Sequence, residues 1–329
     1  MSQITLVTQK NLGLELVRVT EAAALAAGRY MGRGESESVR RSAAEAMGQA
    51  LEMVNMDAEL VVVDAHPETN QTLVSGLRCG QGTGPGVDLA AGPIDGVSLV
   101  ARGLTGAIAV IAATDRSAMH LSRSVYLEKI AVGASAKGAV DLTDSVENNL
   151  RRIAFAKGGR VADLTIVILD RPRHQELLQD VRQAGARVSL FSDGEVSAAV
   201  MTGLEESGID AVMGIGGVED ATIAACALKC LGGELQTRAW IRNEDDAREL
   251  EAAGIEPNRV YTIEDLAGGD EVVFAATGVT DGRLLHGVRY HDHWAESESL
   301  VLRSHSGTLR RISTQHHFAL APEHARRVQ

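Results

Sequence analysis

Three strand-like runs decide the fold: LTIVIL at residues 164–169, ARVSLF at 186–191 and AVMGI at 211–215. Each run is short and mainly apolar, which is typical of a β-strand. Helical patterns around residues 175–184 and 195–207 separate the runs. This alternation predicts a βαβ series with a mostly parallel sheet, and therefore an α/β protein.

The flanking segments extend the same pattern in both directions. Apolar residues at helical spacing predict helices over 11–31 and 37–55. Further strands are expected at Leu60–Val63, Gly106–Ala113, Val272–Ala276 and Ser299–Arg303. A helix stop and turn at 157–159 places a boundary near residues 150–160. We therefore expect an N-terminal α/β domain over 1–155 and a C-terminal α/β domain over 156–329.

Charge and composition exclude several function classes. The 329 residues include 32 Lys+Arg and 44 Asp+Glu, so the net charge is 32 − 44 = −12. An acidic chain with only 3% aromatic residues is a poor binder of nucleic acid or anionic membranes. Apolar stretches such as Ala107–Ala113 are far shorter than the roughly 18 residues that span a bilayer. With no signal-peptide pattern in the first residues, a cytoplasmic protein is expected.

Cysteines and histidines offer weaker signals of metal chemistry. The three cysteines, Cys79, Cys226 and Cys230, lack zinc-site spacing and are expected to be small buried residues in a reducing cytoplasm. The tail contains His291, His293, His305, His316 and His317, with Asp292 between the first two. A solvated polar surface is the favoured interpretation of this tail, with metal binding as the alternative.

Four segments place chemistry-bearing residues at turns and strand ends. They are Pro93-Ile94-Asp95-Gly96, Arg173-His174, Asp193-Gly194-Glu195 and Gly214-Ile215-Gly216-Gly217. Ligands of open α/β sheets bind beyond the carboxyl ends of the strands. Arginine can hold a phosphate through its planar fork, and glycines allow the backbone to approach it closely. The sequence therefore predicts a sugar-phosphate pocket.

The order of these segments along the chain resembles the class II fructose-1,6-bisphosphatases. The same order includes Arg18-Val19-Thr20-Glu21, Gly32-Arg33-Gly34, Tyr126-Leu127-Glu128-Lys129, Ala276-Thr277-Gly278 and Leu309-Arg310-Arg311-Ile312. The resemblance implies a two-domain layered αβαβα sandwich of the sugar phosphatase type. It also implies a homo-oligomer that uses Mg²⁺ or Mn²⁺ to hydrolyse the 1-phosphate of fructose 1,6-bisphosphate, and in some photosynthetic members also sedoheptulose 1,7-bisphosphate.

The resemblance assigns roles to individual positions of this chain. Asp95 and Glu35 would be catalytic, and the metal ligands would be Glu35, Asp95 and, more weakly, Asp220. The substrate contacts would be Asp95, Gly96, Tyr126, Arg173, His174, Asp193, Gly194, Glu195 and Gly216.

Other positions depart from the family pattern. Gly92 stands where the family has a metal-binding Asp, Val97 where it has a water-orienting Thr, and Ala65 where an ungapped alignment places a metal-binding Glu. Because the ions need anionic ligands, weakened phosphatase activity is expected. One hypothesis is an enzyme with a metal site rebuilt from Glu35, Asp64, Glu68, Asp88, Asp95 and Asp220. The other is a metal-free, inactive paralogue that binds sugar phosphate or regulates an active homologue.

Overall fold

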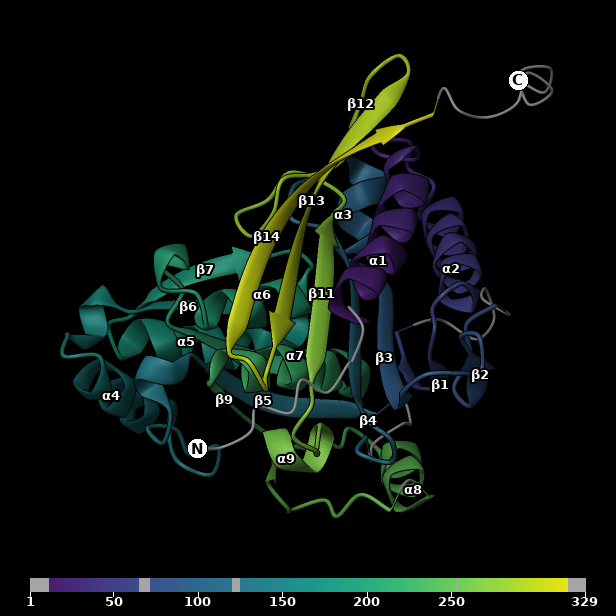
Figure 1. Ribbon diagram of the computed structural model, residues 1–329. Helices are drawn as coiled ribbons and strands as arrows, with labels where there is room; N and C mark the ends of the chain where they lie inside the picture. The colour runs from purple at the N-terminus through teal and green to yellow at the C-terminus, as the bar shows by residue number, and fades with distance from the viewer. Residues whose placement is uncertain (1–11, 65–71, 120–124, 253, 319–329) are drawn as a thin grey trace, which may run out of the picture.

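The computed structural model describes residues 12–64, 72–119, 125–252 and 254–318 (Figure 1). Its helices are α1 (Leu12–Gly28), α2 (Ser36–Glu52), α3 (Val97–Arg102), α4 (Val146–Ala156), α5 (Gln175–Gln183), α6 (Glu195–Thr202), α7 (Val218–Leu231), α8 (Glu244–Ala252) and α9 (Ile263–Leu266). Its first strands are β1 (Asp57–Val63), β2 (Leu77–Cys79), β3 (Gly86–Asp95), β4 (Ile108–Asp115), β5 (Tyr126–Val132), β6 (Thr165–Leu169) and β7 (Arg187–Phe191). They are followed by β8 (Ala211–Gly217), β9 (Glu234–Ala239), β10 (Tyr261–Thr262), β11 (Val273–Gly278), β12 (Arg289–Tyr290), β13 (Trp294–Arg303) and β14 (Thr308–His317).

Two sheets organise the strands. The eight-stranded sheet has the order β12-β13-β11-β4-β3-β1-β2, with β14 paired to β13. The six-stranded sheet has the order β10-β9-β5-β8-β6-β7. Within it β6 pairs in parallel with both β7 and β8, which confirms the predicted βαβ series. Its other half is antiparallel, because β5 runs against both β8 and β9.

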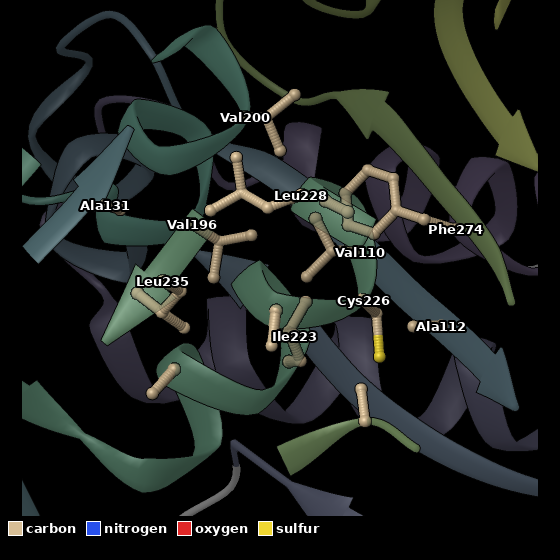
Figure 2. Packing of buried hydrophobic residues seen from close by; sticks show 14 of the residues in the cluster. Val110, Ala112, Ala131, Val196, Val200, Ile223, Cys226, Leu228, Leu235 and Phe274 are labelled. Atoms are coloured by element: carbon tan, nitrogen blue, oxygen red, sulfur yellow. The ribbon is translucent and has the colours of Figure 1, made fainter. Parts of the chain in front are cut away.

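Helices and sheets alternate in five layers. One apolar cluster joins α1 and α2 to the eight-stranded sheet, and a second packs α6 and α7 between the two sheets. A third cluster packs α4 and α5 on the outer face of the six-stranded sheet. The αβαβα arrangement expected from the resemblance is therefore confirmed. Figure 2 shows the middle cluster, where Val110 and Phe274 approach Ile223 and Cys226 of α7.

The sheets do not divide at the boundary expected near residue 155. Strand β5 lies before that point and belongs to the six-stranded sheet, whereas β11, β13 and β14 lie after it and complete the eight-stranded sheet. The ranges 1–155 and 156–329 therefore do not correspond to one sheet each. As a statement about two folding units, the division stays a prediction.

The predicted helices and strands are mostly found within a few residues of their expected positions. One difference is at residues 195–207, where α6 ends at Thr202 and a separate 3₁₀ turn covers Glu205–Ser207. Among the described residues, no helix combines the length and apolar character needed to cross a membrane.

Candidate active site

A cavity of about 360 Å³ lies beyond the carboxyl ends of strands from both sheets. β1 and β3 of the eight-stranded sheet contribute the segments around Asp64 and Asp95, and β6 and β8 of the other sheet contribute those around Arg173 and Gly216. Helix α2 closes one wall with Arg40. The cavity is thus built where ligands of α/β proteins usually bind.

Most of the predicted site residues meet in this cavity. Its lining includes Asp95, Gly96, Tyr126, Arg173, Asp193, Glu195, Gly216 and Asp220. It does not include Glu35, His174 or Gly194. The roles assigned to all of these residues stay predictions, but their convergence shows that segments up to 125 positions apart form one site.

The three predicted residues outside the lining have local partners. His174 is buried, and its Nδ1 lies 2.7 Å from the carbonyl oxygen of Leu169 while its Nε2 accepts a hydrogen bond from the Ile215 N–H at 2.8 Å. Burial lowers the pKa of His174, so a neutral ring joins β6 to β8. Exposed Glu35 precedes α2 and accepts a hydrogen bond from the Ser38 hydroxyl at 2.9 Å.

Gly194 shapes the turn before α6 without lining the cavity. Its φ of +90° is in the left-handed region that favours glycine. A Cβ at this position would also lie 3.1 Å from the Ser197 hydroxyl. The residue therefore sets the direction in which Asp193 and Glu195 leave the turn.

Several carboxylates line the cavity and affect one another electrostatically. Burial raises the pKa of Asp64 to about 7, with the charges of Glu219 and Asp193 adding to the effect. Burial likewise holds the pKa of Asp95 and Asp220 well above their usual range. Asp95 keeps one partner, because its Oδ2 accepts a hydrogen bond from the Ser197 N–H at 2.9 Å at the start of α6. An uncompensated acidic group of this kind favours a bound cation.

A buried lysine neutralises part of this charge. Lys129 forms an ion pair with Glu195, and the two side chains are 3% and 9% exposed. Its Nζ also donates to the Gly217 carbonyl oxygen at 3.2 Å. Glu195 lies so close to Gly216 that a Cβ on that glycine would sit 1.9 Å from Oε2. The ion pair therefore fixes both the glutamate and the glycine turn that borders the cavity.

Arginines and an aromatic ring also line the cavity. Arg173 donates from Nε and Nη2 to the Ile215 carbonyl oxygen at 3.1 and 2.8 Å, and its guanidinium lies 5.3 Å from the centre of the Tyr126 ring. Arg171 donates to the Ser192 carbonyl oxygen at 2.6 Å. These contacts hold two cations near the cavity at defined positions, as an anionic ligand requires.

The predicted metal ligands are only partly brought together. Asp64, Asp95 and Asp220 line the cavity, whereas Glu35 does not. Asp88 is also outside the lining, and its Oδ2 accepts hydrogen bonds from the N–H groups of Ala118 and Met119 at 3.0 and 3.3 Å. Ala65 and Glu68 lie outside the described residues. Within the described ranges, no three His, Cys, Asp or Glu side chains are grouped to hold an ion. The donor chemistry of the cavity fits a hard divalent cation, although its side chains do not converge on one point.

Among the described residues, the C-terminal histidines likewise do not group to hold an ion. His293 pairs with Asp292 at 2.8 Å, His305 pairs with Glu271 at 3.1 Å, and the ring of His291 stacks on Trp294. These separate contacts favour the polar-surface interpretation. All three cysteines are free thiols.

Apolar side chains pack closely around Gly92. It lies opposite Val110 in the β3–β4 pair. A Cβ on Gly92 would be 2.8 Å from Cγ2 of Val110, 3.4 Å from Cδ1 of Ile223 and 4.0 Å from Cβ of Asp64. Apolar side chains thus occupy the space into which a side chain at residue 92 would extend.

Sequence reasoning did not identify Arg40 or Glu219, which also line the cavity, and left Arg171 out of the predicted site. For Arg171 a signal was present, because it follows the same strand as Arg173. The sequence contains no such signal for Arg40, because Arg40 and Arg41 are adjacent and a helical pattern does not show which of them faces a ligand.

Comparisons with known proteins show the family of this chain. The family described as "Bacterial fructose-1,6-bisphosphatase, glpX-encoded" matches residues 10–316. A "D-fructose 1,6-bisphosphatase class 2/sedoheptulose 1,7-bisphosphatase" of Synechococcus sp. (strain JA-2-3B'a(2-13)) is 38% identical, covering 93% of this chain and 95% of the relative. A "Fructose-1,6-bisphosphatase class 2" of Haemophilus influenzae is 36% identical, covering 93% and 96%. The chain belongs to the class II fructose-1,6-bisphosphatase family.

Proposed function

We propose that this protein hydrolyses the 1-phosphate of fructose 1,6-bisphosphate slowly, with the help of Mg²⁺ or Mn²⁺. The observation that carries the proposal is one cavity lined by both carboxylates and arginines. The printed name of the Synechococcus relative supports sedoheptulose 1,7-bisphosphate as a second substrate. The family also supports a homo-oligomer in the cytoplasm, which light scattering and cell fractionation would test.

Asp64, Asp95 and Asp220 are the residues that would hold the ion. Their hard oxygen donors suit Mg²⁺ and Mn²⁺, and their raised pKa values reflect negative charge that a cation would offset. A bound ion supplies Lewis-acid stabilisation of the phosphoryl oxygens and a more acidic water. Glu35 would act with Asp95 only if its exposed side chain turns toward the cavity.

The sugar phosphate would be positioned by the remaining lining residues. Arg173 is held by Ile215 and by the Tyr126 ring, so its guanidinium is oriented before a ligand binds. Asp193 accepts a hydrogen bond from the Ser98 hydroxyl at 2.7 Å, which fixes a carboxylate suited to sugar hydroxyls. Gly216 lines the cavity, and Glu195 fills the space into which a side chain at this position would extend. His174 and Gly194 would support these groups from behind.

The slow rate follows from what residues 92 and 97 do not supply. Gly92 offers no carboxylate to an ion, and Val97 lines the cavity with methyl groups instead of a hydroxyl. If Ala65 stands at a third ligand position, the acidic set is smaller again. Loss of groups that act together lowers turnover by orders of magnitude.

A second candidate function is binding without turnover, including regulation of an active homologue. It is favoured by the packing around Gly92, because Val110 and Ile223 fill the space that a carboxylate at residue 92 would need. The cavity would then hold sugar phosphate in the absence of a metal ion.

Phosphate release from fructose 1,6-bisphosphate separates the two candidates. We expect slow release with Mn²⁺, loss of release with EDTA, and loss again in Asp220→Asn. Binding of the sugar bisphosphate in calorimetry with no phosphate release under any metal condition would support the second candidate and contradict the first.

A further inference from the structure

We propose that Arg40, which lines the cavity, binds one phosphoryl group of the ligand, so that the protein holds a sugar bisphosphate without a divalent ion. The inference rests on the proposed binding of a sugar bisphosphate in this cavity, and adds a residue that neither the resemblance nor the comparisons assign.

Arg40 is placed to reach a ligand. It lies in the first two turns of α2, and Arg40 and Ala44, one helical turn apart, both line the cavity. Its side chain is half-buried, whereas that of the adjacent Arg41 is exposed and is not part of the lining. The helix therefore presents one of two neighbouring arginines to the ligand.

No hydrogen bond or ion pair joins Arg40 to another residue of the described ranges. The positive charge of Arg40 acts on Asp64. It lowers the pKa of that carboxyl group, while the stronger effect of burial raises it. Its guanidinium donors are consequently available, in contrast with Arg173, two of whose donors are already used by the Ile215 carbonyl oxygen. A planar guanidinium with free donors is suited to a phosphate group.

The arginines that line the cavity come from two different parts of the fold. Arg40 comes from α2, on the eight-stranded sheet, while Arg171 and Arg173 follow β6 of the six-stranded sheet. A ligand with two phosphates can present one to each of these groups. Arg40 therefore makes the cavity selective for a bisphosphate over a monophosphate.

Calorimetry in EDTA tests the assignment with three variants. Wild type should bind fructose 1,6-bisphosphate more tightly than fructose 6-phosphate. Arg40→Gln should weaken binding of the bisphosphate by about 10- to 100-fold, the effect of losing one charged hydrogen-bonding partner, and should leave fructose 6-phosphate nearly unchanged. Arg40→Lys, which keeps the charge without the fork, should fall between them, and Arg41→Gln should behave as wild type.

The outcomes separate this inference from the proposed function. Three outcomes would overturn the role of Arg40 and leave the proposed function standing. They are undiminished bisphosphate binding by Arg40→Gln, equal losses of affinity for both sugars in that variant, and binding by wild type only in the presence of Mn²⁺. Absence of sugar-phosphate binding by wild type, with and without Mn²⁺, would refute the proposed function itself. Melting curves by circular dichroism establish that each variant is folded.

Discussion

The packing around Gly92 predicts that a side chain can be added at this position only if Val110 is replaced by a smaller residue. The contact is direct, because an added Cβ would lie 2.8 Å from Cγ2 of Val110, well inside the roughly 3.5–4.0 Å optimum between carbon atoms. Val110 and Ile223 are both 0% exposed in the cluster of Figure 2, so neither can turn toward solvent.

The expected magnitudes follow from this overlap. Gly92→Ala should lower the free energy of unfolding by about 1–3 kcal/mol, the usual cost of overpacking. Val110→Ala should cost about 2 kcal/mol for the buried methyl groups that it removes. In the double variant the new methyl occupies part of the space that Val110 leaves. We expect the double variant to be more stable than the sum of the single effects predicts by about 1–3 kcal/mol.

Urea unfolding of the four proteins measures this coupling, with the slope against denaturant as the check that only stability has changed. Gly159→Ala is the matched control, because a Cβ there would meet no atom within 4 Å, and it should combine additively with Val110→Ala. Additivity of Gly92→Ala and Val110→Ala within about 0.5 kcal/mol would refute the steric argument. If coupling is found, Gly92→Asp with Val110→Ala should bind Mn²⁺ more tightly than Val110→Ala alone.

Three further outcomes are expected. Lys129→Met leaves Glu195 buried without its counter-charge and should lower the free energy of unfolding in urea by about 3–5 kcal/mol. The double variant Lys129→Met with Glu195→Gln should recover part of this loss. A loss below about 1 kcal/mol in Lys129→Met would contradict the role of the ion pair. Burial raises the pKa of Cys79 to about 11 and that of Cys230 to about 12, so alkylation of the folded protein should be negligible at pH 8 and should increase about tenfold per pH unit above it. A folded-state thiol that reacts at pH 8 as fast as free cysteine would argue against this burial. Mn²⁺ at 100 times its Kd should add about 2.7 kcal/mol to the free energy of unfolding of wild type and so raise its melting temperature. Asp220→Asn should remove this rise. An equal rise in the variant would exclude Asp220 as a ligand.

The strands of the parallel series were predictable because β6 and β8 are buried and consist of continuous apolar runs. Strand β14 was harder, since it lies at the sheet edge with its residues half-buried or exposed and its sequence shows little alternation. The pairing of β11 with β4 on one side and β13 on the other also depends on contacts between segments that are separated along the chain. Local patterns contain no information on such pairings.

The candidate site shows the same limit. Arg173 and Asp193 could be predicted because the parallel strands β6 and β7 end at a common edge of one sheet. Asp95 could be predicted because it stands at a sharp turn at the end of β3 of the other sheet. His174 follows such a strand too, yet its ring joins β6 to β8 and does not line the cavity. Arg40 could not be predicted, because the face of α2 that meets the cavity depends on how the helix packs.

The features at Gly92 and Arg40 change the charge of the cavity in the same direction. Gly92 supplies no carboxylate, and the guanidinium of Arg40 adds one positive charge that acts on Asp64. Both make a metal ion less necessary for holding an anionic ligand, while neither replaces an ion that activates water. Binding and turnover should therefore separate in this protein: binding of the bisphosphate should depend on Arg40, and whatever hydrolysis occurs should depend on the divalent ion.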